Sequence, residues 1–255
     1  MAQGNLLIMP RRVVFEGAKK SQDLVLTNTG NDSAKYVVSF VQMRMKHDGS
    51  FEQIATPDSG QNFSEKYFRI FPRTVTLGPN KSQVVKMQLV KPAKMMPGEY
   101  MSHIYFRAIP KENPLGEEAQ KEATSVSVRL IPIFGITIPA IIRVGECSVK
   151  AEIKDLALRK VNDTVTVLKM KFTRSGNISV YGDLSVTYTS PLGKVTHVAG
   201  AKGIAVYTPG TYRTFECPLD RSSGIDYRSG KLTVTYTVPD DVKAARLAEA
   251  ELILP

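Results

Sequence analysis

The side chains best suited to catalysis or metal binding are few in this chain and widely separated. Its three histidines are His47, His103 and His197, and no cysteine or carboxylate cluster at metal-ligand spacing surrounds them. The sequence also has no Gly-x-Ser-x-Gly elbow, no phosphate-cradling glycine loop and no recognisable pair of catalytic carboxylates. We therefore expect a protein without enzymatic activity, metal ion or cofactor, whose histidines are ordinary surface or strand residues.

The composition is that of a folded, basic protein. The 255 residues are 42% hydrophobic and 23% charged, which excludes a disordered chain or a coiled coil. Lys and Arg outnumber Asp and Glu by 34 to 24, and a net charge of +10 suits nucleic acid, an acidic protein or an anionic membrane equally well. The longest apolar run, residues 131–142, is interrupted by Pro132 and Pro139 and is shorter than the about 20 residues of a spanning helix. We expect no membrane insertion.

Hydrophobic residues alternate with a period of two along most of the chain, and turn residues separate the runs. The clearest runs in the first half are residues 23–27, 36–41, 84–90 and 100–106. About seven further runs follow, the number that an immunoglobulin-like sandwich needs. We predict an all-β chain of two such sandwiches, residues 1–143 and 144–255, with a hinge at residues 144–146. Residues 241–250 have high helix propensity and are either a short helix or the start of a last strand.

A polar segment is followed by a long apolar strand near the end of the first half. Residues 110–123 contain two prolines, a glycine and few apolar side chains, so we predict a mobile loop. The chain then alternates, with Val126, Val128 and Leu130 on one face, and becomes apolar on both faces up to Ile142. Such a strand is either a buried central strand or an edge strand that binds a partner by β-augmentation, and the preceding loop favours the edge.

Several motifs, in order along the chain, resemble one known protein family. They are Pro-Arg-Arg-Val-Val-Phe-Glu-Gly at residues 10–17, residues 23–30, residues 71–86, Gly98-Glu99-Tyr100 with residues 105–110, residues 181–184 and residues 206–209. The first four are similar to the first, second, middle and sixth strands of the PapD-like superfamily, the periplasmic chaperones of chaperone-usher pilus assembly. The last two resemble elements of its divergent, archaic-type members. The resemblance covers essentially the whole chain.

The resemblance implies a binding function without catalysis and a boomerang arrangement of the two sandwiches. In this family the seventh strand of the first domain fills a groove in a pilus subunit that lacks its own final strand. By alignment, Val126, Val128 and Leu130 would be the donated residues. Each large aliphatic side chain inserted in this way recovers about 1.5 to 3 kcal/mol of burial. The implied partners are pilus subunits and an outer-membrane usher.

The family also holds the subunit's C-terminal carboxylate with an arginine on the first strand and a lysine on the seventh. Arg12 occupies the arginine position, and a guanidinium can bind a carboxylate through two hydrogen bonds. The lysine position falls at Phe134 and Gly135, so the lysine is missing, as we expect of a divergent member. Arg12 is thus the predicted anchor, alone or with a substitute for the lysine. The substitutes considered are Arg129, Arg107 and Arg143.

The resemblance implies the oxidising periplasm and a mature form whose signal peptide has been removed. Cys147 and Cys217, the only cysteines, could then form a disulfide or remain buried thiols. An apolar edge strand leaves self-association open. The main alternative is a two-domain immunoglobulin-like adhesion or binding protein, which needs neither Arg12 nor a donor strand. Nucleic-acid binding is supported by charge alone, and we do not expect it.

Overall fold

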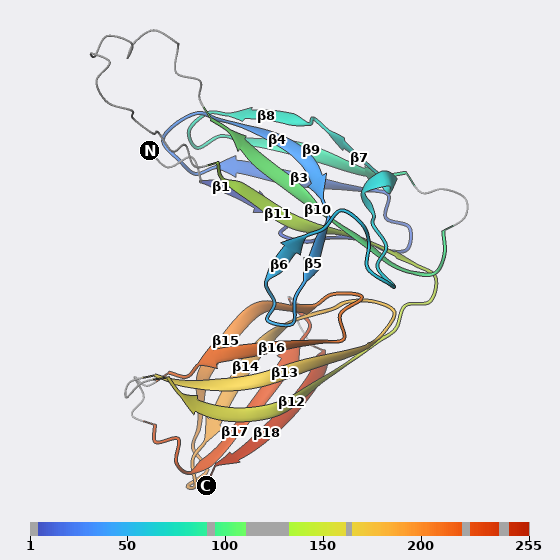
Figure 1. Cartoon of the computed structure of the whole chain (residues 1–255). Helices are drawn as coiled ribbons and strands as arrows, with labels where there is room; N and C mark the ends of the chain where they lie inside the picture. Colours follow the sequence, from blue (N-terminus) through green and yellow to red (C-terminus); the bar gives the residue numbers. More distant parts are fainter. Residues whose placement is uncertain are drawn as a thin grey trace, which may run out of the picture. The chain divides into compact units, whose positions relative to one another are not determined.

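The computed structural model describes residues 5–90, 95–110, 133–161, 165–220, 225–239 and 245–254, which are mostly β-strands (Figure 1). These residues contain 18 strands and one short 3-10 turn, η1 (Glu65–Tyr67). Within them, no helix has the length and hydrophobicity needed to cross a membrane. The chain forms two compact units, which are Met1–Gln42, Phe63–Met95 and Tyr100–Ile142 for the first, and Met43–Asn62, Met96–Glu99 and Arg143–Pro255 for the second.

The first unit is a sandwich of two sheets. Sheet A has the strand order β1-β3-β9-β7, and sheet B has the order β2-β11-β10-β4-β8. The strands are β1 (Leu6–Met9), β2 (Val13–Phe15), β3 (Ser21–Asn28), β4 (Ala34–Val41), β7 (Phe68–Phe71), β8 (Thr74–Leu77), β9 (Ser82–Leu89), β10 (Gly98–Ile109) and β11 (Gly135–Val144). The start of β10, up to Glu99, and the end of β11, from Arg143, belong to the second unit. Alternate side chains point into the core between the sheets, where the ring of Phe15 lies 5.0 Å from that of Phe68. Residues 10–12 carry the chain from β1 in sheet A to β2 in sheet B.

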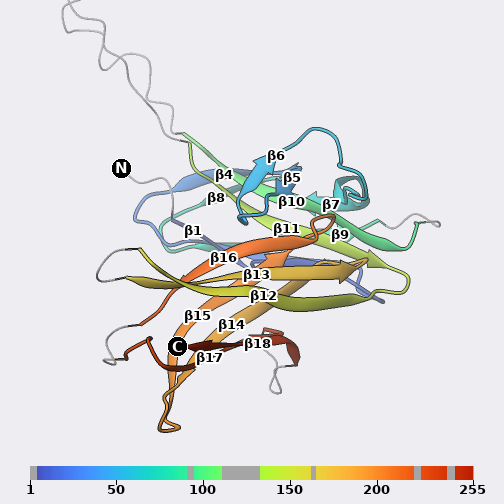
Figure 2. The ribbon, with the colours of Figure 1, turned by 60° about the horizontal axis from the view of Figure 1, so that its bottom comes forward.

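The second unit is also a sandwich of two sheets (Figure 2). Sheet C has the order β12-β13-β16 and sheet D the order β15-β14-β17-β18. Their strands are β12 (Val149–Lys160), β13 (Thr166–Gly176), β14 (Val180–Thr189), β15 (Val195–Val206), β16 (Tyr212–Pro218), β17 (Gly230–Thr237) and β18 (Arg246–Leu254). The core lies between the sheets, with the ring of Phe172 5.0 Å from that of Tyr236.

A hairpin of β5 (Met43–Met45) and β6 (Phe51–Gln53) belongs to the second unit, although it follows β4 of the first unit in sequence. Its tip lies against β16. The backbone N–H of Thr214 donates to the carbonyl of His47 at 2.7 Å, and the His47 ring stacks on Tyr212 at 3.9 Å. Gly49, at the turn with φ of +84°, packs against the guanidinium of Arg213, where a Cβ atom would overlap it.

The prediction of an all-β chain with two sandwiches is confirmed. The runs at residues 23–27, 36–41, 84–90 and 100–106 fall in β3, β4, β9 and β10. For residues 241–250 the strand alternative is correct where the structure describes them. From Arg246 the backbone pairs with β17, and this pairing outweighs local helix propensity. The predicted loop at residues 110–123 and the start of the long strand lie outside the described residues.

Candidate functional site

Within the described residues, one edge of β11 is only partly paired, and we call its unpaired part the open edge. β11 lies between β10 and β2, but β2 pairs with it only from Val13↔Ala140 to Phe15↔Ile142. Among the residues that the structure describes, no other strand pairs with residues 135–139 on that side. The side chains of Ile133 and Phe134, just before β11, are about half exposed. An open edge of this kind can accept an additional strand through backbone hydrogen bonds.

Arg12 lies where this open edge begins. Because Val13 pairs with Ala140 in a parallel register, continuing the register places Arg12 beside Pro139. Arg12 is partly buried, and its Nε and Nη2 atoms are shielded from solvent. A guanidinium at the end of an open edge is well placed to bind the terminal carboxylate of an added strand. The structure thus brings together Arg12 and the described part of the predicted donor strand.

The other predicted site residues have different surroundings. Arg107 is exposed on β10, and the adjacent Ala108 N–H donates to the carbonyl of Phe134, which places Arg107 at the far end of the open edge from Arg12. Arg143 is already engaged, because its Nε lies 3.2 Å from Glu99 Oε2 and its Nη2 donates to the carbonyl of Ser179. The remaining candidates, Val126, Val128, Arg129 and Leu130, lie outside the described residues.

The two cysteines are separate thiols in the structure, so the disulfide that the sequence left open is not formed there. Cys217 lies on β16 with its side chain in the core of the second unit, opposite Leu168 on β13. Burial raises the pKa of the Cys217 thiol. Cys147 lies in the turn before β12, with its Sγ 3.6 Å from the carbonyl oxygen of Gly145.

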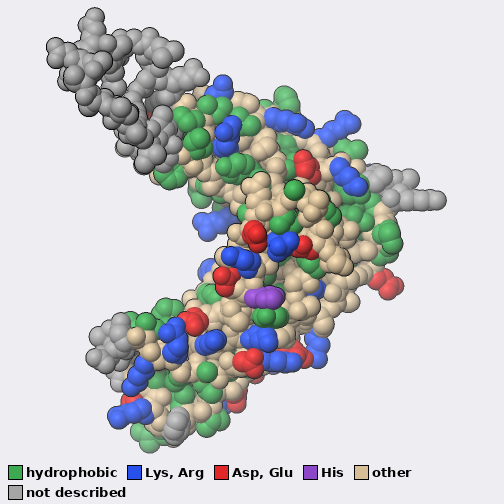
Figure 3. Space-filling view, viewed as in Figure 1, with side chains coloured by type: hydrophobic (Ala, Val, Ile, Leu, Met, Phe, Trp, Pro, Cys, Tyr) green, Lys and Arg blue, Asp and Glu red, His purple; other side chains and the backbone are tan. Residues whose placement is uncertain are grey.

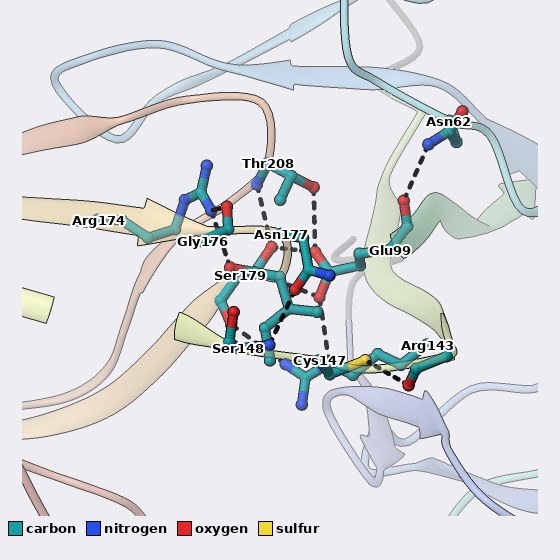
Figure 4. A network of polar contacts seen from close by, with 12 residues as sticks. Asn62, Glu99, Arg143, Cys147, Ser148, Arg174, Gly176, Asn177, Ser179 and Thr208 are labelled. Carbon is teal, nitrogen blue, oxygen red and sulfur yellow. Dashed lines mark hydrogen bonds and ion pairs between the residues drawn. The ribbon is translucent and has the colours of Figure 1, made fainter. Parts of the chain in front are cut away.

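A buried polar network is centred on Glu99, at the start of β10 (Figure 4). Besides Arg143, its carboxylate accepts hydrogen bonds from the Ser179 N–H at 3.1 Å, from the Ser179 hydroxyl and from the Thr208 hydroxyl at 3.1 Å. Its backbone carbonyl accepts a hydrogen bond from Asn62. A fully buried carboxylate is stable only with such a set of donors. Nothing in the sequence predicted this network, since Glu99 stood out only as part of the Gly98-Glu99-Tyr100 motif.

Arg174 reinforces the same region of the second unit. Its Nε donates to the carbonyl of Gly210 at 2.9 Å, and its Nη1 donates to the carbonyls of Gly176 at 2.8 Å and Ile178 at 2.9 Å. Burial lowers the pKa of this guanidinium, and the charge of Glu99 opposes that shift. Arg174 therefore fixes loop backbone and is not available to a partner.

The surface offers no metal site within the described ranges, where no three His, Cys, Asp or Glu side chains come together. Basic and hydrophobic side chains are interspersed on the visible face of the first unit (Figure 3). On the outer face of sheet A, Leu7, Met9, Val25 and Val84 are 40 to 51% exposed. Met9 pairs with Val25 and Val25 with Val84, so these three side chains form a continuous row across β1, β3 and β9, and Leu7 lies two residues before Met9 on β1. We call this set the sheet A apolar row.

Comparison with known proteins gives matches among solved structures only. No protein-family model and no curated protein matches the chain. The YadV chaperone is 13% identical, with 98% of this chain and 100% of that chain covered and a TM-score of 0.47. The E. coli chaperone DraB is 16% identical, with coverages of 98% and 97% and a TM-score of 0.46, and so is a structure of Salmonella enterica SafA pilin in complex with the SafB chaperone. At these identities and TM-scores, we carry over no residue role from them.

Proposed function

We propose that this chain is a pilus-assembly chaperone of the PapD-like type, acting in the periplasm. It binds a pilus subunit that lacks its final strand, supplies the missing strand from β11 and the residues before it, and delivers the subunit to an outer-membrane usher. The observation that carries the proposal is the open edge of β11 with Arg12 at its end. The strand motifs of the sequence support the same family.

Binding by strand addition follows from the chemistry of this edge. A subunit without its final strand exposes core side chains and unpaired backbone groups, and an added strand satisfies both. Val126, Val128 and Leu130 are separated by even intervals from Ile138 and Ala140, whose side chains are buried in the first unit. If the strand continued without a bulge, the three side chains would lie on the same face as Ile138 and Ala140. One apolar face would then extend from the chaperone core into the subunit groove. We propose these three residues as the donated side chains.

Arg12 is proposed to bind the C-terminal carboxylate of the subunit. A subunit strand running along the open edge of β11 would end beside Arg12 if it ran in the direction of β11 itself, as β2 does. A charge-assisted hydrogen bond to that carboxylate would then fix the register of the added strand. The alternative function, a two-domain adhesion protein, gives no role to an arginine at this position.

The usher is proposed to dock on the sheet A apolar row, which leaves the β11 edge available to the subunit. At the end of the same sheet, a cleft of about 450 Å³ has a lining that is partly basic and partly apolar, made of Gly17, Lys19, Lys20, Arg69, Gln88, Leu89 and Val90. A partner with an apolar surface beside acidic residues would complement this face. A double variant, Val25→Lys with Val84→Lys, is expected to lose usher binding and to keep subunit binding, because the two surfaces are separate. Loss of both, or of neither, would count against this assignment.

The test of the chaperone function is copurification after periplasmic co-expression with tagged pilus subunits of the parent system. Wild type is expected to be retained, and a triple variant with Ser at Val126, Val128 and Leu130 is expected to be lost. The matched control changes Ser125 and Ser127, on the opposite face of the alternating segment, to Ala. Retention of the triple variant at the wild-type level would refute the donor assignment. Failure of wild type to bind any subunit would refute the function.

A further inference from the structure

Two buried serines connect β11 to the segment that contains η1. Ser64 and Ser102 are both essentially inaccessible to solvent. The Ser102 hydroxyl, on β10, accepts hydrogen bonds from the backbone N–H groups of Ser64 at 2.9 Å and Glu65 at 3.0 Å. The Ser64 hydroxyl in turn donates to the carbonyl of Ala140, on β11, at 2.8 Å. A continuous chain of hydrogen bonds therefore runs from β10 through residues 64–65 to β11. We call it the serine link.

The serine link meets β11 at the base of the open edge. Ala140 is the first residue of β11 that pairs with β2, through Val13, and the next residue toward the open edge is Pro139. Pro139 has no N–H and cannot donate to either neighbouring strand. Strand ends with few hydrogen bonds fray by local opening. At this point the Ser64 hydroxyl provides an additional bond that the sheet itself does not supply.

Burial makes the choice of serine informative. A hydroxyl in a dry interior costs free energy unless it is hydrogen-bonded. Alanine at position 64 would avoid that cost, whereas alanine at position 102 would leave the N–H groups of Ser64 and Glu65 without this acceptor. Ser102 thus has a local role at the start of η1, and the Ser64 hydroxyl is the one that reaches β11. Their hydrogen bonds have a specific effect, which is to hold one carbonyl of β11 at a fixed distance from η1 and β10.

We propose that Ser64 and Ser102 are positioning residues for strand donation. By holding Ala140, the serine link keeps residues 135–139 extended and in the register that an incoming subunit strand requires. The inference rests on the proposed function, and it adds two residues that are buried and so act through β11. Its effect should therefore appear as greater mobility of β11 and faster release of the subunit.

The direct test is hydrogen-deuterium exchange of the full chain without any partner. In Ser64→Ala, the amides of β11 are expected to lose protection by roughly two- to tenfold, as for loss of one hydrogen bond. Amides of β3 and β9 in sheet A are expected to be unchanged. Ser102→Ala is expected to give the same pattern, and it keeps the test valid if Ser64→Ala does not fold. The matched control is Ser82→Ala, whose hydroxyl bonds Thr27 on sheet A. Unchanged β11 protection in both variants would overturn the inference.

The second measurement tests whether the serine link affects subunit binding. The probe is the pilus subunit that wild type retains in copurification, and the readout is its rate of dissociation from each chaperone variant. Faster dissociation from Ser64→Ala and Ser102→Ala, with an unchanged rate from Ser82→Ala, supports positioning. Equal rates from all variants would overturn it while leaving the chaperone function intact. Absence of wild-type binding would instead refute the function, and the exchange experiment would still decide whether the serine link orders β11.

Discussion

The carboxylate of Glu99 and the guanidinium of Arg143 form an ion pair, with Arg143 Nε 3.2 Å from Glu99 Oε2 and no part of the Glu99 side chain exposed. Glu99 begins β10, and Arg143 lies one residue before the end of β11. These strands are neighbours in sheet B, and at their opposite ends the Ala108 N–H donates to the carbonyl of Phe134. The ion pair therefore fixes the end of β11 that is remote from the open edge.

Removing one partner of this pair should destabilise the protein strongly. We expect Arg143→Met to lower the free energy of unfolding by about 3 kcal/mol, because the Glu99 carboxylate would stay buried without its countercharge. Urea denaturation followed by circular dichroism measures this change. A double variant with Glu99→Gln should recover part of the loss, since no buried charge remains. A single-variant loss below about 1 kcal/mol, the value of an exposed pair, would contradict this account of the network.

His103 should make stability depend on pH. The residue is buried on β10, and desolvation lowers its pKa from 6.5 to about 4. Between these values the unfolded chain binds a proton that the native chain does not, so acidification favours unfolding. The stabilisation is complete above pH 6.5 and is lost progressively as the pH falls toward 4, by about 3 kcal/mol in total.

The measurement is the difference in unfolding free energy between wild type and His103→Leu at several pH values from 4 to 7. The difference should change by about 3 kcal/mol across that range, because only wild type can protonate at this position. His197→Asn, at an exposed position on β15, is the control and should follow wild type. A constant difference between wild type and His103→Leu would show that His103 does not control this dependence.

The hairpin of the second unit should be sensitive to substitution at Gly49. An alanine there is strained by the positive φ, and it also displaces the guanidinium of Arg213 from its hydrogen bond to the carbonyl of Ala205. Gly193 has a similar φ of +81° and open space around it, so Gly193→Ala reports the backbone strain alone. We expect Gly49→Ala to be less stable than Gly193→Ala by about 1 kcal/mol, the value of one hydrogen bond.

Thermal unfolding compares the two glycine variants, and limited proteolysis at residues 43–62 reports release of the hairpin. In a double-mutant cycle, Gly49→Ala and Arg213→Ala should not be additive. Gly49→Ala should destabilise the protein less when Arg213 is already alanine than it does in wild type. Additive effects of the two substitutions would mean that the hairpin does not depend on this contact.

Subunit retention should depend on Arg12 and not on Arg107. Loss of a charge-assisted hydrogen bond costs about 1.5 to 3 kcal/mol, so Arg12→Ala is expected to weaken subunit binding by roughly 10- to 100-fold. Arg12→Lys should be intermediate, because an ammonium keeps the charge but lacks the planar geometry of a guanidinium. Arg107→Ala, at the far end of the open edge, is the matched control and should bind as wild type does. Equal subunit binding by Arg12→Ala and Arg107→Ala would contradict the assignment of Arg12 to the subunit-binding site.

The sequence predicted elements well where the evidence for them was local. The run at residues 84–90 predicted β9 because alternation of buried and exposed side chains is a property of the strand itself. Near the C-terminus, local evidence was ambiguous, since residues 241–250 favour a helix by propensity. The backbone pairing of β18 with β17 makes this segment a strand. Helix propensity is a local quantity and takes no account of a partner strand elsewhere in the chain.

The candidate site was partly predictable. Arg12 was found from its motif, but its place beside the open edge depends on the parallel register of β2 and β11, which joins residues more than 120 positions apart. Ser64 had no distinguishing neighbours in the sequence, and the motif that contains Glu99 did not predict its buried partners. Each acquires its role only from partners on other elements, namely Ala140 for Ser64 and Arg143 for Glu99.

The sequence by itself determined that this protein is all-β, that it forms two sandwiches and that it has no recognisable catalytic motif, because strand periodicity and motif content are local properties. Tertiary structure decided which edge stays open, that the hairpin at residues 43–53 joins the second unit, and that Arg143 is occupied by Glu99. These features depend on contacts between distant residues. Their free energies are realised only when both partners are buried together.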